Sequence, residues 1–290
     1  MVNGGILPPG ATRVVPDRFA GRVALVTGST QGLGETLARR LVAEGLSGLV
    51  VTGRNAERGE AVAQAMSAEQ RHDGSTCEVM FQPAALDDAA EVEGLLAAAK
   101  DRFGTVHHLA NCAAFTERMD IWESTPEFHD QMMAVNLRAP LQLMQGVAEM
   151  LRDAGQPGSI VNIGSVAAYG GFPGIMSYSA SKMALVTLSR SIAFQLMRHG
   201  IRVNVVQPGW MDTPAEDQIQ RQFHGATDGW LERAEAEQPW GRLIKPAELA
   251  TTLAFVLSDD AGMMSGAVID FDQTVAGVGD LDKPGPELGP

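Results

Sequence analysis

Residues 177–182, with the sequence SYSASK, place a phenol and a primary amine four positions apart, at Tyr178 and Lys182. The residues that follow, MALVTLSRSIAFQL, predict a long amphipathic helix, and two side chains four positions apart share one face of a helix. Such a pair is either a proton-transfer device or two half-exposed helix side chains. The spacing alone does not decide between them, so the elements that would position the pair have to be considered.

Those elements follow an alternation of short β-branched segments and longer helical patterns. The segments that we predict to be strands are 22–28, 48–53, 77–83, 106–111, 159–164, 201–208 and 267–271. This alternation predicts an α/β fold with a doubly wound parallel sheet and helices on both faces. No composition break or linker divides residues 20–275, which predicts a single domain between an N-terminal arm (1–19) and a C-terminal tail (276–290).

One long polar segment, residues 210–243, interrupts the alternation and contains three tryptophans, Trp210, Trp230 and Trp240. An insertion after the carboxyl end of a late strand is well placed to cover the binding crevice of such a sheet. We therefore predict a substrate lid here. A peripheral pair of helices is the alternative.

The composition of the chain argues against several classes of partner and site. A net charge of −13 over 290 residues argues against nucleic acid or an anionic membrane as a partner. The two cysteines, Cys77 and Cys112, cannot form a disulfide framework or a Cys-rich zinc site, and together with the lack of a signal sequence or apolar span they favour the cytoplasm. His107 and His108 lack acidic or cysteine partners at ligand spacing, so no metal site is expected.

A glycine-rich turn, TGSTQGLG (27–34), follows the first predicted strand and opens the first predicted helix. Glycines at positions 28, 32 and 34 allow a sharp turn and a close approach of a pyrophosphate to bare backbone amides. The helix N-terminus adds oriented N–H groups and the positive end of a dipole. In this context the turn predicts binding of a dinucleotide.

The end of the second predicted strand, VVTGRN, bears on which dinucleotide binds. An acidic residue that takes the ribose hydroxyls is usual at this point, but Gly53 stands there and Arg54 follows. A guanidinium binds phosphate oxygens bidentately, so the sequence favours NADP over NAD. The alternative is that Arg54 is a solvated loop residue.

Taken together, these motifs resemble those of the short-chain dehydrogenase/reductase family over roughly residues 20–275. TGSTQGLG, NCAA (111–114), VN (135–136), IVNIGS (160–165), YSASK (178–182) and QPG (207–209) occur in the order of that family. The resemblance implies a single-domain Rossmann-like fold and hydride transfer between NAD(P) and a secondary alcohol or carbonyl. It also implies a homotetramer, which two predicted helices with broad apolar surfaces support.

By this resemblance the catalytic residues are Asn136, Ser165, Tyr178 and Lys182. Tyr178 is expected to be the acid/base, and Lys182, with the charged nicotinamide ring, to lower the phenol pKa from about 10. Lys182 should also hold the nicotinamide ribose hydroxyls, and Ser165 should align the substrate oxygen. Asn136 is expected to hold a water relay to Lys182, or else to be a structural core amide.

The resemblance further implies a set of cofactor contacts along the same crevice. They come from Gly28, Ser29, Thr30, Gly32, Leu33, Gly34, Arg54, Asn111, Ala113, Tyr178, Lys182, Pro208, Gly209 and Thr213. The chain departs from the family pattern at three places. Cys112 and Ala114 replace an amide and a glycine, Ala85 stands where an acidic residue often binds adenine, and DQT (272–274) replaces DGG.

Two other functions share these motifs. A nucleotide sensor or scaffold on the same fold is the main alternative, although it would not need the phenol–ammonium pair. Relatives that catalyse dehydration or epimerisation usually carry a larger substrate domain, for which this chain has no room. The substrate is expected to be a small alcohol or carbonyl compound. The polar residues of the predicted lid favour a sugar or polyol over a steroid or acyl chain.

Overall fold

The sheet has the predicted parallel, doubly wound arrangement. The computed structural model describes residues 13–71, 74–170 and 174–275, so most of the predicted arm and all of the predicted tail lie outside the described residues. Its strands pair in the order β3-β2-β1-β4-β5-β6-β7, all parallel. They are β1 (Val23–Thr27), β2 (Gly48–Val51), β3 (Glu78–Phe81), β4 (His108–Asn111), β5 (Gly158–Ile163), β6 (Ile201–Pro208) and β7 (Val268–Phe271).

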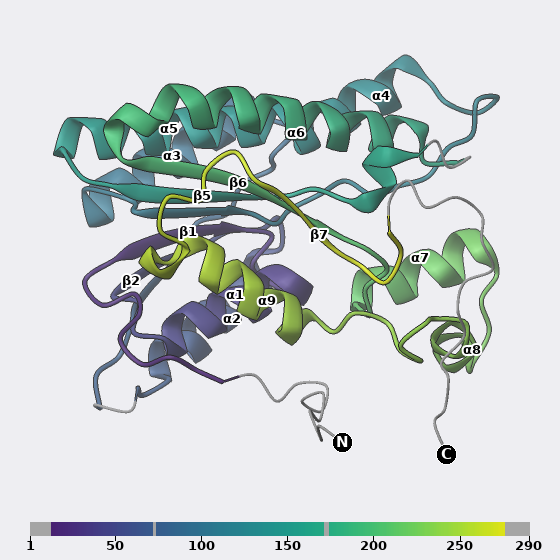
Figure 1. Ribbon diagram of the computed structural model, residues 1–290, viewed down its shortest axis with the longest axis horizontal. Helices are drawn as coiled ribbons and strands as arrows, with labels where there is room; N and C mark the ends of the chain where they lie inside the picture. Colours follow the sequence, from purple (N-terminus) through teal and green to yellow (C-terminus); the bar gives the residue numbers. More distant parts are fainter. Residues whose placement is uncertain (1–12, 72–73, 171–173, 276–290) are drawn as a thin grey trace.

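Helices cover both faces of this sheet, as Figure 1 shows. One layer contains α3 (Ala89–Phe103), α5 (Ala139–Ala154) and α6 (Met176–Leu196), with α4 (Pro126–Met133) at its end. The opposite layer contains α1 (Gly32–Ala43), α2 (Ala56–Ala68) and α9 (Pro246–Leu257). Each layer buries its own apolar cluster against the sheet, which is why the strands carry β-branched and aliphatic residues on both faces.

Local sequence marks where several of the helices begin. The side chains of Asn55, Asp88, Thr125 and Thr213 each accept a hydrogen bond from a first-turn amide of the helix that follows, and so act as N-caps. In α1, as in α5 and α6, the N-cap side chain makes no such bond; in α1 that residue is Gln31. The first amides of α1 are therefore left for another partner at the edge of the sheet.

Near the N-terminus, the described part of the arm is held against the domain. Phe19 is fully buried and packs edge-on against His108, with 5.2 Å between the ring centroids. Arg18 forms ion pairs with Glu44 and Asp260. The last residues of the predicted arm are thus part of the folded domain.

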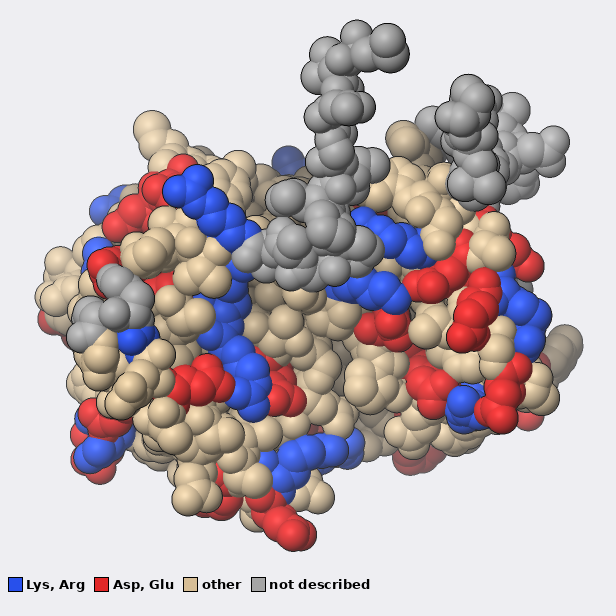
Figure 2. Space-filling view, turned by 90° about the horizontal axis from the view of Figure 1, so that it is seen from below, with Lys and Arg blue, Asp and Glu red and all other residues tan. Residues whose placement is uncertain are grey.

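The segment predicted as a lid lies beyond one end of the sheet (Figure 1). It forms two helices, α7 (Pro214–His224) and α8 (Trp230–Ala236), and Trp210 stacks on Trp230 with 6.3 Å between ring centroids. Within the described residues, no helix is long and apolar enough to cross a membrane. On the face seen in Figure 2, acidic and basic side chains are interspersed in small groups.

Candidate active site

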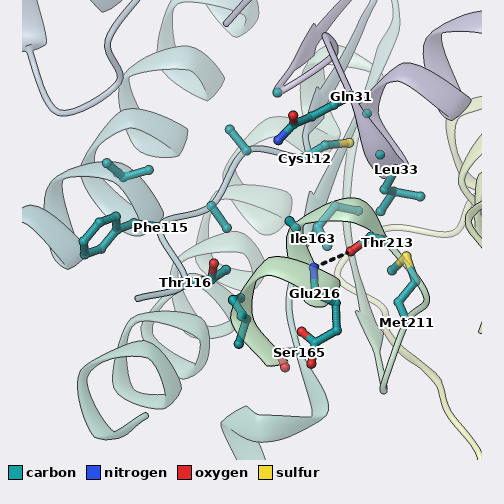
Figure 3. A pocket seen from close by; sticks show the side chains of 18 of the residues that line it. Gln31, Leu33, Cys112, Phe115, Thr116, Ile163, Ser165, Met211, Thr213 and Glu216 are labelled. Carbon is teal, nitrogen blue, oxygen red and sulfur yellow. Dashed lines mark hydrogen bonds between the residues drawn. The ribbon is translucent and has the colours of Figure 1, made fainter. Parts of the chain in front are cut away.

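A cleft of about 1150 Å³ opens at the carboxyl ends of the strands. Because parallel strands end at the same edge, the turns after β1, β2, β4, β5 and β6 meet there, at the point where the strand order reverses. The N-terminal part of α6 and one face of α7 complete the walls. Figure 3 shows several of these side chains around the cleft.

The glycine-rich turn forms a close-fitting cradle at one end of the cleft. Gly28 and Gly32 have φ of 63° and 57°, a region that side-chain-bearing residues rarely adopt. A Cβ on Gly34 would lie 2.4 Å from the carbonyl oxygen of Gly28. The turn and the uncapped start of α1 therefore leave bare backbone against the cleft, which suits a pyrophosphate.

At the end of β2, the cleft presents two guanidinium groups. Arg54 and Arg58 are both exposed and both line it, and neither side chain has an ion pair among the described residues. The Oγ1 atom of Thr52, also on the wall, is buried and has no hydrogen-bond partner in the described part of the chain. A Cβ on Gly53 would lie 2.9 Å from Thr30 Oγ1, so a side chain at residue 53 would displace Thr30.

Tyr178, Lys182 and Ser165 meet deeper in the cleft. Tyr178 and Lys182 lie one turn apart on α6, with 5.6 Å between Lys182 Nζ and the centre of the phenol ring. Lys182 is only 2% exposed, and its Nζ donates a hydrogen bond of 2.7 Å to the carbonyl oxygen of Ile163. Ser165 follows β5 and caps the short 3₁₀ turn Val166–Tyr169.

The electrostatics of this group differ from the sequence-based expectation. Burial raises the pKa of Tyr178 above its ordinary value, and a hydrogen bond from Ser165 offsets part of that increase. Burial also lowers the pKa of Lys182 to about 8. In the chain without a cofactor, desolvation therefore dominates, and the expected lowering of the phenol pKa requires the positive charge of an oxidised nicotinamide ring.

Asn136 lies in a π-helical turn, Ala134–Arg138, between α4 and α5. Its amide accepts a hydrogen bond from the backbone N–H of Phe115 at 2.8 Å and donates one to the Phe115 carbonyl at 3.0 Å. It also donates to Ser181 Oγ, 3.1 Å away. The residue thus ties the loop after β4 to the start of α6, and it lies behind the cleft wall rather than on it.

Most of the predicted site residues line the cleft, but Ser29, Asn111 and Asn136 do not. Ser29 Oγ donates to the Val26 carbonyl at 2.6 Å and accepts from the Thr52 amide at 3.0 Å, which joins the turn after β1 to β2. Asn111 donates to Asn162 Oδ1 at 2.7 Å between neighbouring strands. The predicted residues that do line the cleft are Gly28, Thr30, Gly32, Leu33, Gly34, Arg54, Ala113, Ser165, Tyr178, Lys182, Pro208, Gly209 and Thr213.

The substrate end contains polar residues that sequence reasoning missed. Arg118 comes from the loop after β4, and Gln220 and His224 join Glu216 on one face of α7. The signal was the spacing of residues 216, 220 and 224, which repeats every four positions and places them on one side of a helix. Arg118 gives no such signal, because nothing local marks a loop arginine as facing a cleft.

Several lid residues that motivated the polyol prediction face elsewhere. Asp212 pairs with Lys245 at 2.8 Å, and Asp217 binds Arg221 and the indole of Trp230. Of these acidic residues, Glu216 lines the cleft, as does Thr213. The Glu216 backbone N–H donates a hydrogen bond of 3.1 Å to Thr213 Oγ1 (Figure 3, dashed line). The polar side chains at the substrate end are therefore Glu216 and the residues around it, Arg118, Gln220 and His224.

The three departures from the family pattern now have structural settings. Cys112 and Ala114 line the cleft, and burial raises the pKa of the Cys112 thiol to about 12, so this thiol is neutral. Ala85 itself does not line the cleft, but the nearby Asp87 does. Gln273 joins the end of the sheet to the lid, since it accepts from the Trp240 amide at 2.9 Å and donates to the Arg242 carbonyl at 2.7 Å.

His107 and His108 have partners of their own. His107 contacts Gln156 at 3.1 Å, and His108 Nδ1 contacts Ser159 Oγ at 2.8 Å. Among the residues that the structure describes, no three histidine, cysteine or acidic side chains come together where they could hold a metal ion.

Comparison with known proteins agrees with this geometry. A family profile described as enoyl-(acyl carrier protein) reductase matches residues 28–275. Levodione reductase of Leifsonia aquatica is 32% identical, with 90% of this chain and 97% of that protein covered. Sorbitol dehydrogenase of Cereibacter sphaeroides is 30% identical, with 88% and 97% covered. A solved short-chain dehydrogenase/reductase family protein superposes with a TM-score of 0.74 at 33% identity, covering 88% of this chain and 97% of that one.

The chain therefore belongs to the short-chain dehydrogenase/reductase family, as its motifs predicted. It is an NAD(P)-dependent oxidoreductase that acts on an alcohol or carbonyl compound. The cleft fits such a dinucleotide, because it contains a backbone cradle that a Cβ would fill. Among the described residues, the buried Thr52 hydroxyl also has no hydrogen-bond partner and the guanidinium groups of Arg54 and Arg58 have no ion pair.

Proposed function

We propose that this protein is an NADP(H)-dependent oxidoreductase that interconverts a secondary alcohol and a carbonyl, with Tyr178 as the acid/base. The observation that carries the proposal is the convergence of Tyr178, Ser165 and Lys182 in the cleft that also holds the glycine cradle. When bound, the cofactor supplies or accepts the hydride, and the protein controls the proton and the geometry.

Each of the three residues has a separate task in this mechanism. Tyr178 Oη takes the proton from the alcohol oxygen during oxidation and returns it to the carbonyl oxygen during reduction. The Ser165 hydroxyl binds the same substrate oxygen and keeps it aligned with the phenol. Lys182, held by the Ile163 carbonyl, binds the nicotinamide ribose and favours the phenolate by its charge.

Asn136 has a positioning role in this proposal. Its amide bonds to Phe115 and Ser181 fix the loop after β4 against the first turns of α6. That contact keeps Tyr178 and Lys182 in register with the opposite wall. The water relay expected for Asn136 is compatible with this role, since the residue lies directly behind the cleft.

The preference for NADP(H) rests on two arginines. Arg54 and Arg58 both line the cleft where the second strand ends, and no carboxylate occupies residue 53. A 2′-phosphate placed there would receive charge-assisted hydrogen bonds from one or both guanidinium groups. An aspartate at the same position would instead repel it, and this chain has none.

The substrate class that we propose is a small polyol or sugar. Glu216, Gln220 and His224 make the α7 wall of the cleft polar, while Phe115, Ile175 and Ile219 supply some apolar surface. The hydrogen-bonding groups along this wall suit a compact polar substrate better than a long acyl chain.

The decisive test of the activity is Tyr178→Phe, which keeps the ring and removes the proton. We expect kcat to fall by about 10²–10⁴, the usual contribution of a positioned acid/base, with the dissociation constant of NADP(H) almost unchanged. Tyr169→Phe is the matched control, since Tyr169 is half exposed and its hydroxyl bonds to Asp270 outside the cleft. A folded Tyr178→Phe protein with turnover near that of the wild type would refute the proposal.

A further inference from the structure

An oppositely charged pair stands at the substrate end of the cleft. Arg118, from the loop after β4, and Glu216, from the first turn of α7, both line it, with 3.9 Å between Arg118 Nη2 and Glu216 Oε1. Their side chains are 26% and 16% exposed. The pair is thus largely sheltered from bulk solvent. Charges in such a sheltered site interact more strongly than charges on an open surface.

The neighbours of this pair orient it without using all of its hydrogen-bonding groups. Glu216 Oε1 accepts from the indole of Trp210 at 2.8 Å and from Gln220 Nε2 at 2.7 Å. Arg118 Nη1 contacts His224 Nε2 at 2.7 Å. In the described part of the chain, neither Glu216 Oε2 nor Arg118 Nη2 makes a hydrogen bond, since Nη2 lies 3.9 Å from Glu216 Oε1. One acceptor and one donor remain for a ligand.

Both charges act at the phenol. The Glu216 carboxylate raises the pKa of Tyr178, and the Arg118 guanidinium lowers it. Figure 3 shows the Glu216 side chain directed toward the region of Ser165, whose hydroxyl also bonds to Tyr178. The pair therefore faces the place where the reacting carbon must sit.

The chemistry of the pair restricts the substrate. A carboxylate group on the substrate would be attracted by Arg118 but repelled by Glu216. An alcohol with only alkyl neighbours would remove water from both charged groups without giving their unused hydrogen-bonding atoms a partner, which is costly. A second hydroxyl both donates and accepts, so it satisfies the carboxylate and the guanidinium together.

We propose that Arg118 and Glu216 are specificity-determining residues that select a neutral vicinal diol, with Glu216 accepting from, and Arg118 donating to, the hydroxyl beside the reacting carbon. This inference rests on the proposed function, which assigns Tyr178 to the reacting oxygen. It adds the second hydroxyl and the two residues that recognise it.

The test compares cis-cyclohexane-1,2-diol with cyclohexanol in the wild type and in Glu216→Gln. The wild type should favour the diol in kcat/KM, and Glu216→Gln should lower the ratio of kcat/KM for the diol to kcat/KM for cyclohexanol about tenfold. A change in the acid/base strength of Tyr178 acts on both alcohols and leaves this ratio unchanged. Because the same two alcohols are compared in the wild type and in Glu216→Gln, differences in their intrinsic reactivity cancel. Arg118→Met should show the same selective loss.

Asp217→Asn is the matched control, because it makes the same charge change at the next position of α7, where the carboxylate binds Arg221 and Trp230 instead. This variant should leave the diol preference intact. Circular dichroism and thermal unfolding would show that each variant is folded. Equal losses for both alcohols in Glu216→Gln, or the same selective loss in Asp217→Asn, would overturn the inference.

A binding measurement separates this inference from the proposed function. With NADPH present, which cannot accept a hydride from an alcohol, calorimetry should show that the diol binds more tightly than cyclohexanol to the wild type and to Tyr178→Phe, but not to Glu216→Gln. Equal binding of the two alcohols to the wild type would refute the diol selection even if turnover depended on Tyr178. Preferential diol binding, with turnover that survives Tyr178→Phe, would refute the acid/base proposal instead.

Discussion

Tyr178 lies among charges that come from separate parts of the chain. Lys182 is on the same helix, Glu216 is on α7, Arg118 is on the loop after β4, and the neighbouring Cys112 thiol is neutral. Burial raises the phenol pKa more than any of these groups changes it. The acid/base strength of this residue therefore depends on how the walls of the cleft close around it.

The pH profile should report this arrangement. Alcohol oxidation requires the phenolate, so kcat/KM should rise with pH until the pH exceeds the Tyr178 pKa. Glu216→Gln removes a charge that raises this pKa and should move the rising limb to lower pH. Arg118→Met should move it to higher pH, and Asp217→Asn should leave it in place. Shifts of the same sign in the first two variants would contradict this electrostatic account.

We expect single side chains to decide the choice between NADP(H) and NAD(H) as well. Arg54→Ala and Arg58→Ala should each raise KM for NADP(H) about tenfold or more, because a charge-assisted phosphate contact contributes about 1.5–3 kcal/mol. KM for NAD(H) should change little. Arg152→Ala is the control, since Arg152 is exposed on α5 and pairs with Asp153 away from the cleft. A wild type that prefers NAD(H) would show that neither guanidinium binds a 2′-phosphate.

At the scale of elements, the turn between β1 and α1 does most to shape the cofactor end. Its glycines are needed for different reasons, since Gly28 and Gly32 have positive φ whereas Gly34 lies against the Gly28 carbonyl. A second contact joins the predicted lid to the sheet. Gln273, which follows β7, forms hydrogen bonds with the backbone at Trp240 and Arg242. The DQT departure thus ties the end of the predicted lid, at Trp240 and Arg242, to the sheet.

Gly34→Ala should test the turn. The added Cβ would lie 2.4 Å from a backbone oxygen, so the turn must move, and we expect weaker cofactor binding and a free energy of unfolding lower by about 1–3 kcal/mol. Gly94→Ala is the control, because Gly94 is in α3 with no atom near its Cβ position. That exchange should stabilise the protein by about 0.5–1 kcal/mol. Titration with NADP(H) and thermal unfolding would measure both effects.

At the scale of the whole molecule, the helical layer that contains α5 and α6 carries exposed apolar residues. Phe194 on α6 is 76% exposed. Met183 on the same helix, Met197 just after it and Leu141 on α5 are also exposed. An apolar surface of this kind often marks contact between subunits. We propose that α5 and α6 form part of a homotetramer interface.

Light scattering should therefore show a tetramer at micromolar concentration. Phe194→Glu should shift the protein to smaller species, because it buries a charge in the proposed contact. Met263→Glu is the control, since Met263 is 98% exposed in the turn after α9, away from this layer. A monomeric wild type would exclude the interface.

The sequence by itself determined the fold and the local parts of the site. Strand and helix periodicities depend on neighbouring residues, so the strand predicted at 201–208 coincides with β6, Ile201–Pro208. The spacing of Tyr178 and Lys182 and the glycine-rich turn are also local patterns, and the family resemblance rested on them. Even the alternation that predicted the parallel sheet is a property of consecutive segments.

Only the tertiary structure decided how distant residues act together. Arg118 and His224 are 106 positions apart and meet only because the loop after β4 and α7 border the same cleft. The conflict between Thr30 and a side chain at Gly53 likewise arises across two strands. The raised pKa of Tyr178 follows from desolvation by all the surrounding elements, which no local pattern encodes. Contacts and solvation of this kind exist only after the chain has folded, so the substrate end had to be read from the structure.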